Sequence, residues 1–150
     1  MKGCRHHPWR KLRDRYPHID IEWDDSLPDG VTGFWDGANT IYLDPRLTQR
    51  AKRSTIEHET MHLERGFVPV NGVLLAREEA KVDELAARNL ITIDMLIDAL
   101  RWCRGVTGAE LADEVWTDQH TVNVRLATLS AAERAQVCRA LADCDWADPT

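Results

Sequence analysis

The residues best suited to chemistry in this chain are His58, Glu59 and His62, which form the pattern His-Glu-x-x-His. On a helix, residues four apart lie on one face about one turn apart, so both imidazoles can reach one tetrahedral metal ion. Glu59 would lie beside the open coordination position, where a carboxylate can take a proton from water and pass it to a leaving amine. The pattern predicts a zinc site that hydrolyses peptide bonds. The alternative is a chance match, which short motifs do produce.

The neighbouring sequence predicts one helix over about 45–65 that carries this motif. Asp44 and Pro45 suit a helix start, and Gly66 suits a left-handed helix end. Residues spaced by three or four form one stripe that should face inward. The stripe consists of Leu47, Ala51, Thr55, His58 and His62. Two histidines flanking a glutamate on an inward stripe would be costly without a shared ligand, so the context favours a metal site.

A catalytic zinc ion needs a third protein ligand, and the strongly helical stretch 76–87 supplies candidates. Glu79 and Asp83 lie one turn apart on an otherwise apolar face. We expect Glu79 to be the third ligand and Asp83 to accept a hydrogen bond from a ligand histidine, which fixes its tautomer. Glu78 and Glu84 are the competing ligands. The alternative for these carboxylates is a charged helix face that pairs with nearby basic residues in water.

Together, the two stretches resemble the ImmA/IrrE metallopeptidases of phages, integrative elements and bacteria. The resemblance is carried by TIYLDPRLTQRAKRSTIEHETMHLERG and REEAKVDELAARNLI. Members typically show a short strand, a helix with His-Glu-x-x-His, and a helix of the type E-x-x-A-[ND]-x-F-A-x-x-L-L. The resemblance covers about 15–130 and places Glu79 on the ligand glutamate and Asp83 on the Asn/Asp position. The chain departs from the family at Met61, where Gly is frequent, and at Leu85, where Phe is usual.

By this resemblance, the chain would be a zinc-dependent endopeptidase that cuts a partner protein. The substrate would be a repressor-type transcription regulator encoded nearby, whose cleavage relieves repression of phage or mobile-element genes. One zinc ion per chain is implied, although the same donors also suit Mn²⁺. Two other functions stay open. One is an inactive descendant that uses the zinc fold as a binding or regulatory module, and the other is a DNA-binding regulator built on the C-terminal helices.

Composition favours a single domain over 1–150 in a bacterial or host cytoplasm. Hydrophobic residues make up 43% of the chain and charged residues 29%, which is enough for one core. The four cysteines have no metal or redox spacing, which favours reduced thiols in a cytosol. No apolar run approaches the length of a membrane span. The net charge of -6 argues against general nucleic-acid affinity.

The segment 1–18 is a basic arm whose only acid is Asp14. We expect it to be a solvated helix that frays at its N-terminus, and an interaction arm is the alternative. The following segment, 19–91, should hold a sheet and the two metal helices. Alternation over 19–23, and a hairpin within 33–43, predict a small antiparallel sheet packed on the zinc helix. The expected fold class is therefore α+β.

The stretch 39–43 is our expected sheet edge beside the metal, along which an extended substrate could add a strand. The alternative is an edge that the chain covers with its own loops. Tyr42 on this stretch could donate a hydrogen bond to the oxyanion formed during hydrolysis. Its alternative is a half-buried strand aromatic, since strands favour tyrosine.

The remaining segment, 92–150, is expected to be all-helical. Helix starts are indicated at Thr92, at a capping box from Thr107 to Glu110, and at Ser130. This subregion suits a role in substrate docking or in completing the core.

A stretch within this subregion, ELADEVWTDQHTVNVRLATL, has the helix, turn and helix cadence of DNA-binding proteins. Over 107–128, however, four acids stand against Arg125 alone, so a phosphate-binding surface is missing. His120 could approach the site as a donor in the transition state, and its alternative is a lone surface histidine.

Overall fold

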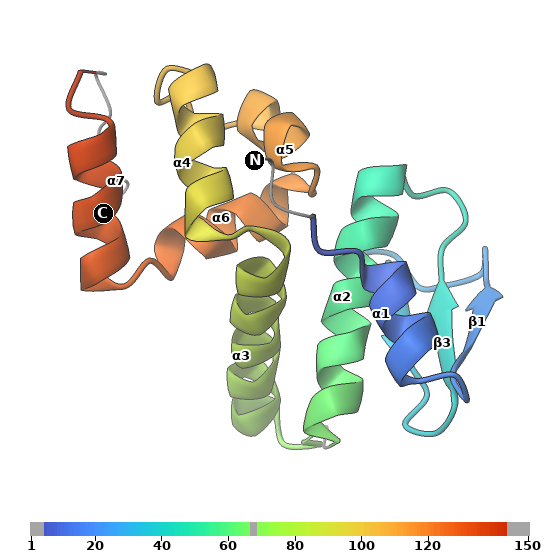
Figure 1. Ribbon diagram of the computed structural model, residues 1–150. Helices are drawn as coiled ribbons and strands as arrows, with labels where there is room; N and C mark the ends of the chain where they lie inside the picture. Colours follow the sequence, from blue (N-terminus) through green and yellow to red (C-terminus); the bar gives the residue numbers. More distant parts are fainter. Residues whose placement is uncertain (1–4, 67–68, 144–150) are drawn as a thin grey trace. The chain divides into compact units, whose positions relative to one another are not determined.

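The structure is a computed structural model that describes residues 5–66 and 69–143 (Figure 1). Over these ranges the fold is mixed α+β, with seven helices and one three-stranded sheet. The chain divides into two compact units, Met1–Ala86 and Ala87–Thr150. The boundary lies within helix α3, Gly72–Leu90, so this helix contributes residues to both units.

The sheet of the first unit consists of β1, Asp20–Trp23, β2, Gly33–Trp35, and β3, Thr40–Leu43, in the order β1-β3-β2. β2 pairs with β3 antiparallel, whereas β1 pairs with β3 parallel. The sequence-based prediction of an antiparallel sheet with 39–43 at its edge is therefore wrong on both points. β3 takes the central position because the hairpin places β2 on one side of it, and the segment after β1 carries the chain across to the other side.

Helix α2, Gln49–Arg65, carries the His-Glu-x-x-His motif and packs on the sheet. It begins four residues later than Pro45 because Thr48 is the N-cap, whose side chain accepts from the Ala51 backbone N–H at 3.2 Å. The Asp44 carboxylate instead accepts from the Arg46 backbone and side chain. The helix ends at Gly66, which adopts the expected left-handed conformation with φ 70°.

The contact between α2 and the edge strand β2 depends on Gly33. A Cβ atom at this position would lie 2.6 Å from the Tyr42 carbonyl oxygen and 2.8 Å from the Thr55 side chain. Both distances are shorter than a carbon atom tolerates, and the carbonyl belongs to the paired central strand and cannot move aside. Only glycine therefore lets α2 approach β2 this closely.

We expect Gly33→Ala to lower the free energy of unfolding by about 2 kcal/mol, because overpacking forces the strand and the helix apart. Urea titration of the wild type and the variant would measure this loss. Gly72→Ala is a matched control, since nothing lies within 4 Å of a Cβ there and the position is helical. It should be neutral or slightly stabilising. Equal destabilisation of both variants would contradict the steric account.

Helix α1, Pro8–Arg15, occupies the basic N-terminal segment and packs on α2. Leu12 is only 2% exposed and joins an apolar cluster with the inward side chains of the sheet and α2. This cluster also contains Ile19, Ile41, Leu43 and Ile56. Over Pro8–Arg15, the segment is thus a packed helix and not the solvated helix that its charge indicated.

A buried carboxylate joins α1 to α2. Glu57 is 0% exposed, and its oxygens lie 2.7 Å from His6 Nε2 and 3.1 Å from Lys11 Nζ. Lys11 also pairs with Glu64 at 2.9 Å. Because a carboxylate out of water is costly unless it is paired, the N-terminal segment is held to α2 by charge as well as by Leu12.

The second unit is built from α4, Ile93–Trp102, α5, Ala109–Val115, α6, Gln119–Ala127, and α7, Ala131–Ala140, with the end of α3. Their apolar faces form one core cluster that includes Leu90, Leu96, Leu100, Leu111, Val122 and Val137. The expected starts at Thr92 and Ser130 are both capped by those side chains. The capping box at Thr107 is absent, because Gly108 takes the N-cap position of α5 without a side-chain bond.

Glu133 ties this unit together through two arginines. Arg125 is 2% exposed and donates to Glu133 at 2.8 Å and to the Ile91 carbonyl oxygen at 2.8 Å, while Arg88 donates to Glu133 at 3.1 Å. Glu133 also completes the capping box of α7. Since Arg125 is buried in this network, the only basic residue of 107–128 is not available to contact phosphate.

This network predicts acid-sensitive stability. The Arg125 hydrogen bond, helped by the Ser130 backbone N–H and Arg88, lowers the pKa of Glu133 to about 2. A lowered pKa stabilises the fold above the ordinary carboxyl range, and that stability is lost as pH falls from about 4.5 towards 2. Solvent screens part of this interaction, so we expect a loss of about 2 kcal/mol over this window. Urea unfolding at pH 5, 4, 3 and 2 would show it, and Glu133→Gln should remove this part of the pH dependence.

Candidate metal centre

Three side chains of the first unit bring their ligand atoms to one point. The Nε2 atoms of His58 and His62 lie 3.1 Å apart. Glu79 Oε1 is 3.0 Å from His62 Nε2, and Glu79 Oε2 is 3.1 Å from His58 Nε2. The helical spacing of the motif places both histidines on one face of α2, and α3 presents Glu79 to them. The structure thus brings together the three residues that the sequence predicted as ligands.

This donor set fits a divalent cation. Two imidazole nitrogens and one carboxylate are the ligands of many catalytic zinc sites, which leave a fourth position open. A tetrahedral zinc ion with bonds of about 2.0–2.1 Å sets its ligand atoms about 3.3 Å apart, close to the 3.0–3.1 Å found here. Glu79 is 41% exposed, so solvent reaches the group from the α3 side. A His/His/Glu group that could hold a metal ion is therefore present, although its geometry does not identify the metal.

Asp83 fixes the orientation of the first histidine. Its Oδ1 lies 2.8 Å from His58 Nδ1, which places the Nδ1 proton between them and directs Nε2 towards His62 and Glu79. Burial alone would lower the pKa of His58, but the Asp83 and Glu79 carboxylates outweigh it and raise this pKa to about 10. For Glu79, the hydrogen bond with His58 lowers the pKa of the carboxyl group.

The second histidine is held differently. His62 Nδ1 is buried and has no hydrogen-bond partner among the described residues. Burial lowers the pKa of His62, which favours the neutral imidazole that metals bind. Unlike His58, His62 therefore has no carboxylate at Nδ1 among the described residues to fix its tautomer.

The competing carboxylates of α3 are engaged elsewhere. Glu78 pairs with Arg65, whose NH2 group lies 2.9 Å from Oε2. Glu84 pairs with Lys81 at 3.3 Å. Glu78 and Glu84 thus pair with basic residues, which was the alternative to metal binding for the carboxylates of this stretch. Glu79 is the α3 glutamate that reaches the histidines.

Glu59 is buried between the histidines of α2 and strand β2. It is 6% exposed, and its Oε2 accepts a hydrogen bond from the Trp35 backbone N–H at 2.9 Å. Burial raises the pKa of Glu59 to about 7, against the opposing effects of His58 and of the Trp35 N–H. A carboxylate with a pKa near neutrality is suited to accept a proton and release it again.

The Trp35 backbone N–H is the part of this site that sequence reasoning missed. Hydrogen bonds from Asp36 N to Thr40 O and from Asp44 N to Thr32 O flank the β2 and β3 pair. Alternate residues therefore pair with β3, and Trp35 directs its N–H away from that strand, towards Glu59. A backbone group leaves no signal in residue type, so only the position of β2 at the edge reveals it.

Of the two remaining sequence candidates, Tyr42 is not brought to this group and His120 belongs to the other unit. Tyr42 stacks on Phe34, with ring centroids 4.8 Å apart, and its neighbours Ile41 and Leu43 point into the core beneath α2. Because side chains alternate along a strand, Tyr42 lies on the sheet face opposite α2. His120 is exposed on α6 in the second unit. Neither residue belongs to the group of side chains that could hold a metal ion.

The assignment of a function depends on these residues themselves. No helix of the described chain is long and apolar enough to pass through a lipid bilayer. Comparison with known protein families, with curated proteins and with solved structures found no match to this chain.

Proposed function

We propose that this chain is a zinc-dependent endopeptidase in which His58, His62 and Glu79 bind the metal and Glu59 transfers protons. The observation that carries the proposal is the convergence of the three ligand side chains within 3.0–3.1 Å, beside a buried carboxylate whose pKa is near 7. A solvated, charged helix face would explain neither the converging ligands nor the buried carboxylate. Glu59 is buried, and both histidines direct Nε2 towards the same point.

In the proposed reaction, Glu59 acts first as a base and then as an acid. When bound, the cation would supply Lewis acidity at the fourth coordination position. Glu59 takes a proton from the attacking water and then donates it to the amide nitrogen that leaves. The Trp35 N–H holds the carboxylate in place throughout, at 2.9 Å from Oε2. Asp83 accepts the Nδ1 proton of His58, which leaves Nε2 as the ring nitrogen directed at the metal position.

The proposed substrate is a protein segment in extended form. β2 is the strand that contacts Glu59, and it lies at the edge of the sheet, so it replaces 39–43 as the place for a substrate strand. The resemblance to ImmA/IrrE metallopeptidases, carried by the motifs on α2 and α3, leads us to propose a repressor-type transcription regulator as the natural substrate.

Purified protein loaded with zinc would test this function. We expect one zinc ion per chain by elemental mass spectrometry and cleavage of the repressor encoded beside it at one or a few bonds. A chelator should abolish cleavage, and zinc or Mn²⁺ should restore it. Stoichiometric zinc binding without cleavage would overturn the proposal and favour an inactive binding or regulatory module.

The role of Asp83 gives a separate prediction. Asp83→Asn should weaken zinc affinity by about 10- to 100-fold, because the amide is a weaker partner for the His58 Nδ1 proton and no longer raises the basicity of the ring. Competition with a fluorescent zinc chelator would measure the change. Glu84→Gln is the control on the same helix, since Glu84 pairs with Lys81. An unchanged affinity in Asp83→Asn would show that packing alone orients His58.

A further inference from the structure

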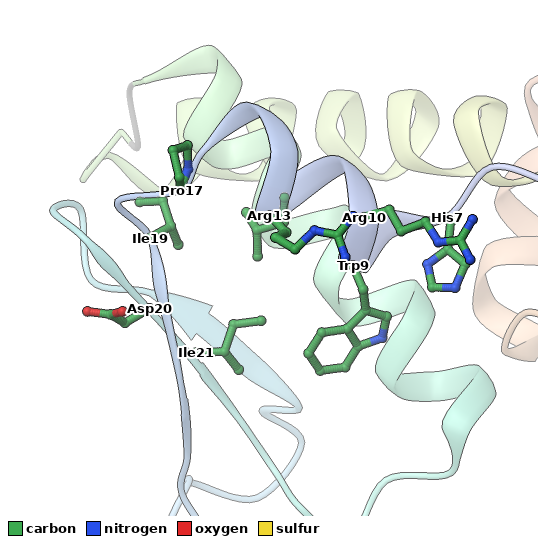
Figure 2. A pocket seen from close by; sticks show the side chains of 9 residues that line it. His7, Trp9, Arg10, Arg13, Pro17, Ile19, Asp20 and Ile21 are labelled. Carbon is green, nitrogen blue, oxygen red and sulfur yellow. The ribbon is translucent and has the colours of Figure 1, made fainter.

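A pocket in the first unit, separate from the metal centre, lies between α1 and β1. Its volume is about 550 Å³. The apolar part of its lining includes Leu12 and Ile19, which are buried, and Ile21, which is half-buried. Figure 2 shows Ile21 on the strand and Trp9 on the helix, with their side chains directed into the space between the two elements. The pocket therefore offers an apolar floor and an aromatic wall.

The rim of this pocket is basic. His7, Arg10 and Arg13 line it from α1 and the residue before α1, and Asp20 is the only acid in the lining. Arg13 pairs with Asp14, but this pair is exposed and therefore weak. Arg10 takes part in no ion pair among the described residues. On a protein with a net charge of -6, such a rim favours a ligand with negative charge next to apolar groups.

The strand beside the pocket has an open side. Asp20 and Asp24 direct their backbone N–H groups to Asn39 O and Leu43 O, at 2.8 and 2.9 Å. By alternation, Ile21 and Trp23 direct their backbone groups away from β3. β1 is the outer strand of the sheet in the part of the chain that the structure describes, so these groups are available to a further strand.

We propose that the α1 and β1 pocket binds an extended, acidic and apolar segment of a partner protein, which pairs with the open side of β1. Its backbone would bond to the outward groups of Ile21 and Trp23, an apolar side chain would enter the pocket, and an acidic side chain would pair with Arg10. A nucleic acid fits less well, because its phosphates gain nothing from the apolar floor or from a strand edge. Binding at this pocket does not depend on the metal centre.

A labelled hexapeptide, acetyl-Glu-Thr-Leu-Thr-Glu-Leu with a C-terminal fluorescein, would serve as the probe in fluorescence anisotropy, because alternation places both glutamates on the same face as the third-position leucine. Chelator is kept in the buffer so that no cleavage can occur. We expect a Kd of about 10–100 µM, typical of a short strand with one anchored side chain. Arg10→Glu should raise the Kd about tenfold. Arg15→Glu is the matched control, because Arg15 is exposed on the same helix and does not line the pocket; its Kd should change less than twofold.

Changes in the probe test the remaining contacts without altering the protein. Serine in place of both leucines should raise the Kd, because no apolar side chain then enters the pocket. Lysine in place of the acids should also raise the Kd, because the ion pair with Arg10 is lost. N-methylation of alternate backbone nitrogens should weaken binding in one register only, as strand pairing requires. The proposal is overturned by equal effects of Arg10→Glu and Arg15→Glu, by no measurable binding, or by tighter binding of a twenty-nucleotide thymidine strand than of the peptide.

Discussion

Glu59→Gln should reduce peptide-bond hydrolysis by about 10³-fold while leaving zinc bound. The amide has the volume of the carboxylate and can still accept the Trp35 N–H through its oxygen, so the local structure is retained. It cannot take a proton from water at neutral pH, and both proton transfers of the proposed reaction are lost. The measurement is kcat/KM on the protein substrate, with zinc content determined on the same samples.

A matched control separates this effect from a general loss of charge. Glu84→Gln removes a carboxylate from α3 that pairs with Lys81 and does not reach the histidines, so hydrolysis should stay within about twofold of the wild type. If Glu59→Gln retained most of the hydrolysis with zinc bound, another group would be the base, and the proposed role of Glu59 would fail.

Lys11→Met should lower the free energy of unfolding by about 3 kcal/mol. Glu57 is 0% exposed, and the variant removes the ammonium group 3.1 Å from its carboxylate. Methionine has almost the same length and is apolar, so packing around α1 is retained. The loss arises because the buried carboxylate keeps His6 but loses its ammonium partner. The same change also removes the ammonium group that lies 2.9 Å from Glu64 Oε1. Urea unfolding followed by circular dichroism would measure it.

The exposed pair on the same helix provides the comparison. Arg13→Met removes an arginine whose side chain is 72% exposed and whose partner, Asp14, is 61% exposed. Water screens such a pair, so the free energy of unfolding should stay nearly unchanged. If the two variants were equally stable, Glu57 would not depend on Lys11 in the folded protein.

The helices and their facing residues were accessible from the sequence because their signals are local. The four-residue spacing of His58 and His62 and the one-turn spacing of Glu79 and Asp83 each place two side chains on one helix face. The cap at Ser130 is equally local. The order of the sheet was not accessible, because the pairing of β1 with β3 joins segments separated by the whole of β2.

Other features were hidden because residue type alone does not tell how a group is used. Glu57 and Lys11 belong to charged stretches that look solvated, yet they pair with each other in the interior. Arg125 stood out in the sequence only as the single Lys or Arg among the acids of 107–128, and in the structure it is a buried partner of Glu133. Thr48 replaces Asp44 as the helix cap because Asp44 bonds to Arg46 within its own turn.

The shortness of β2 has a practical consequence. The strand has three residues, and Glu59 already occupies the outward N–H of Trp35. A substrate chain can form few backbone hydrogen bonds along so short a strand. Most of the binding energy must therefore come from contacts with other surfaces of the protein. Small fluorogenic peptides should therefore be poor reporters of turnover for this protein, and whole folded proteins should be the better assay.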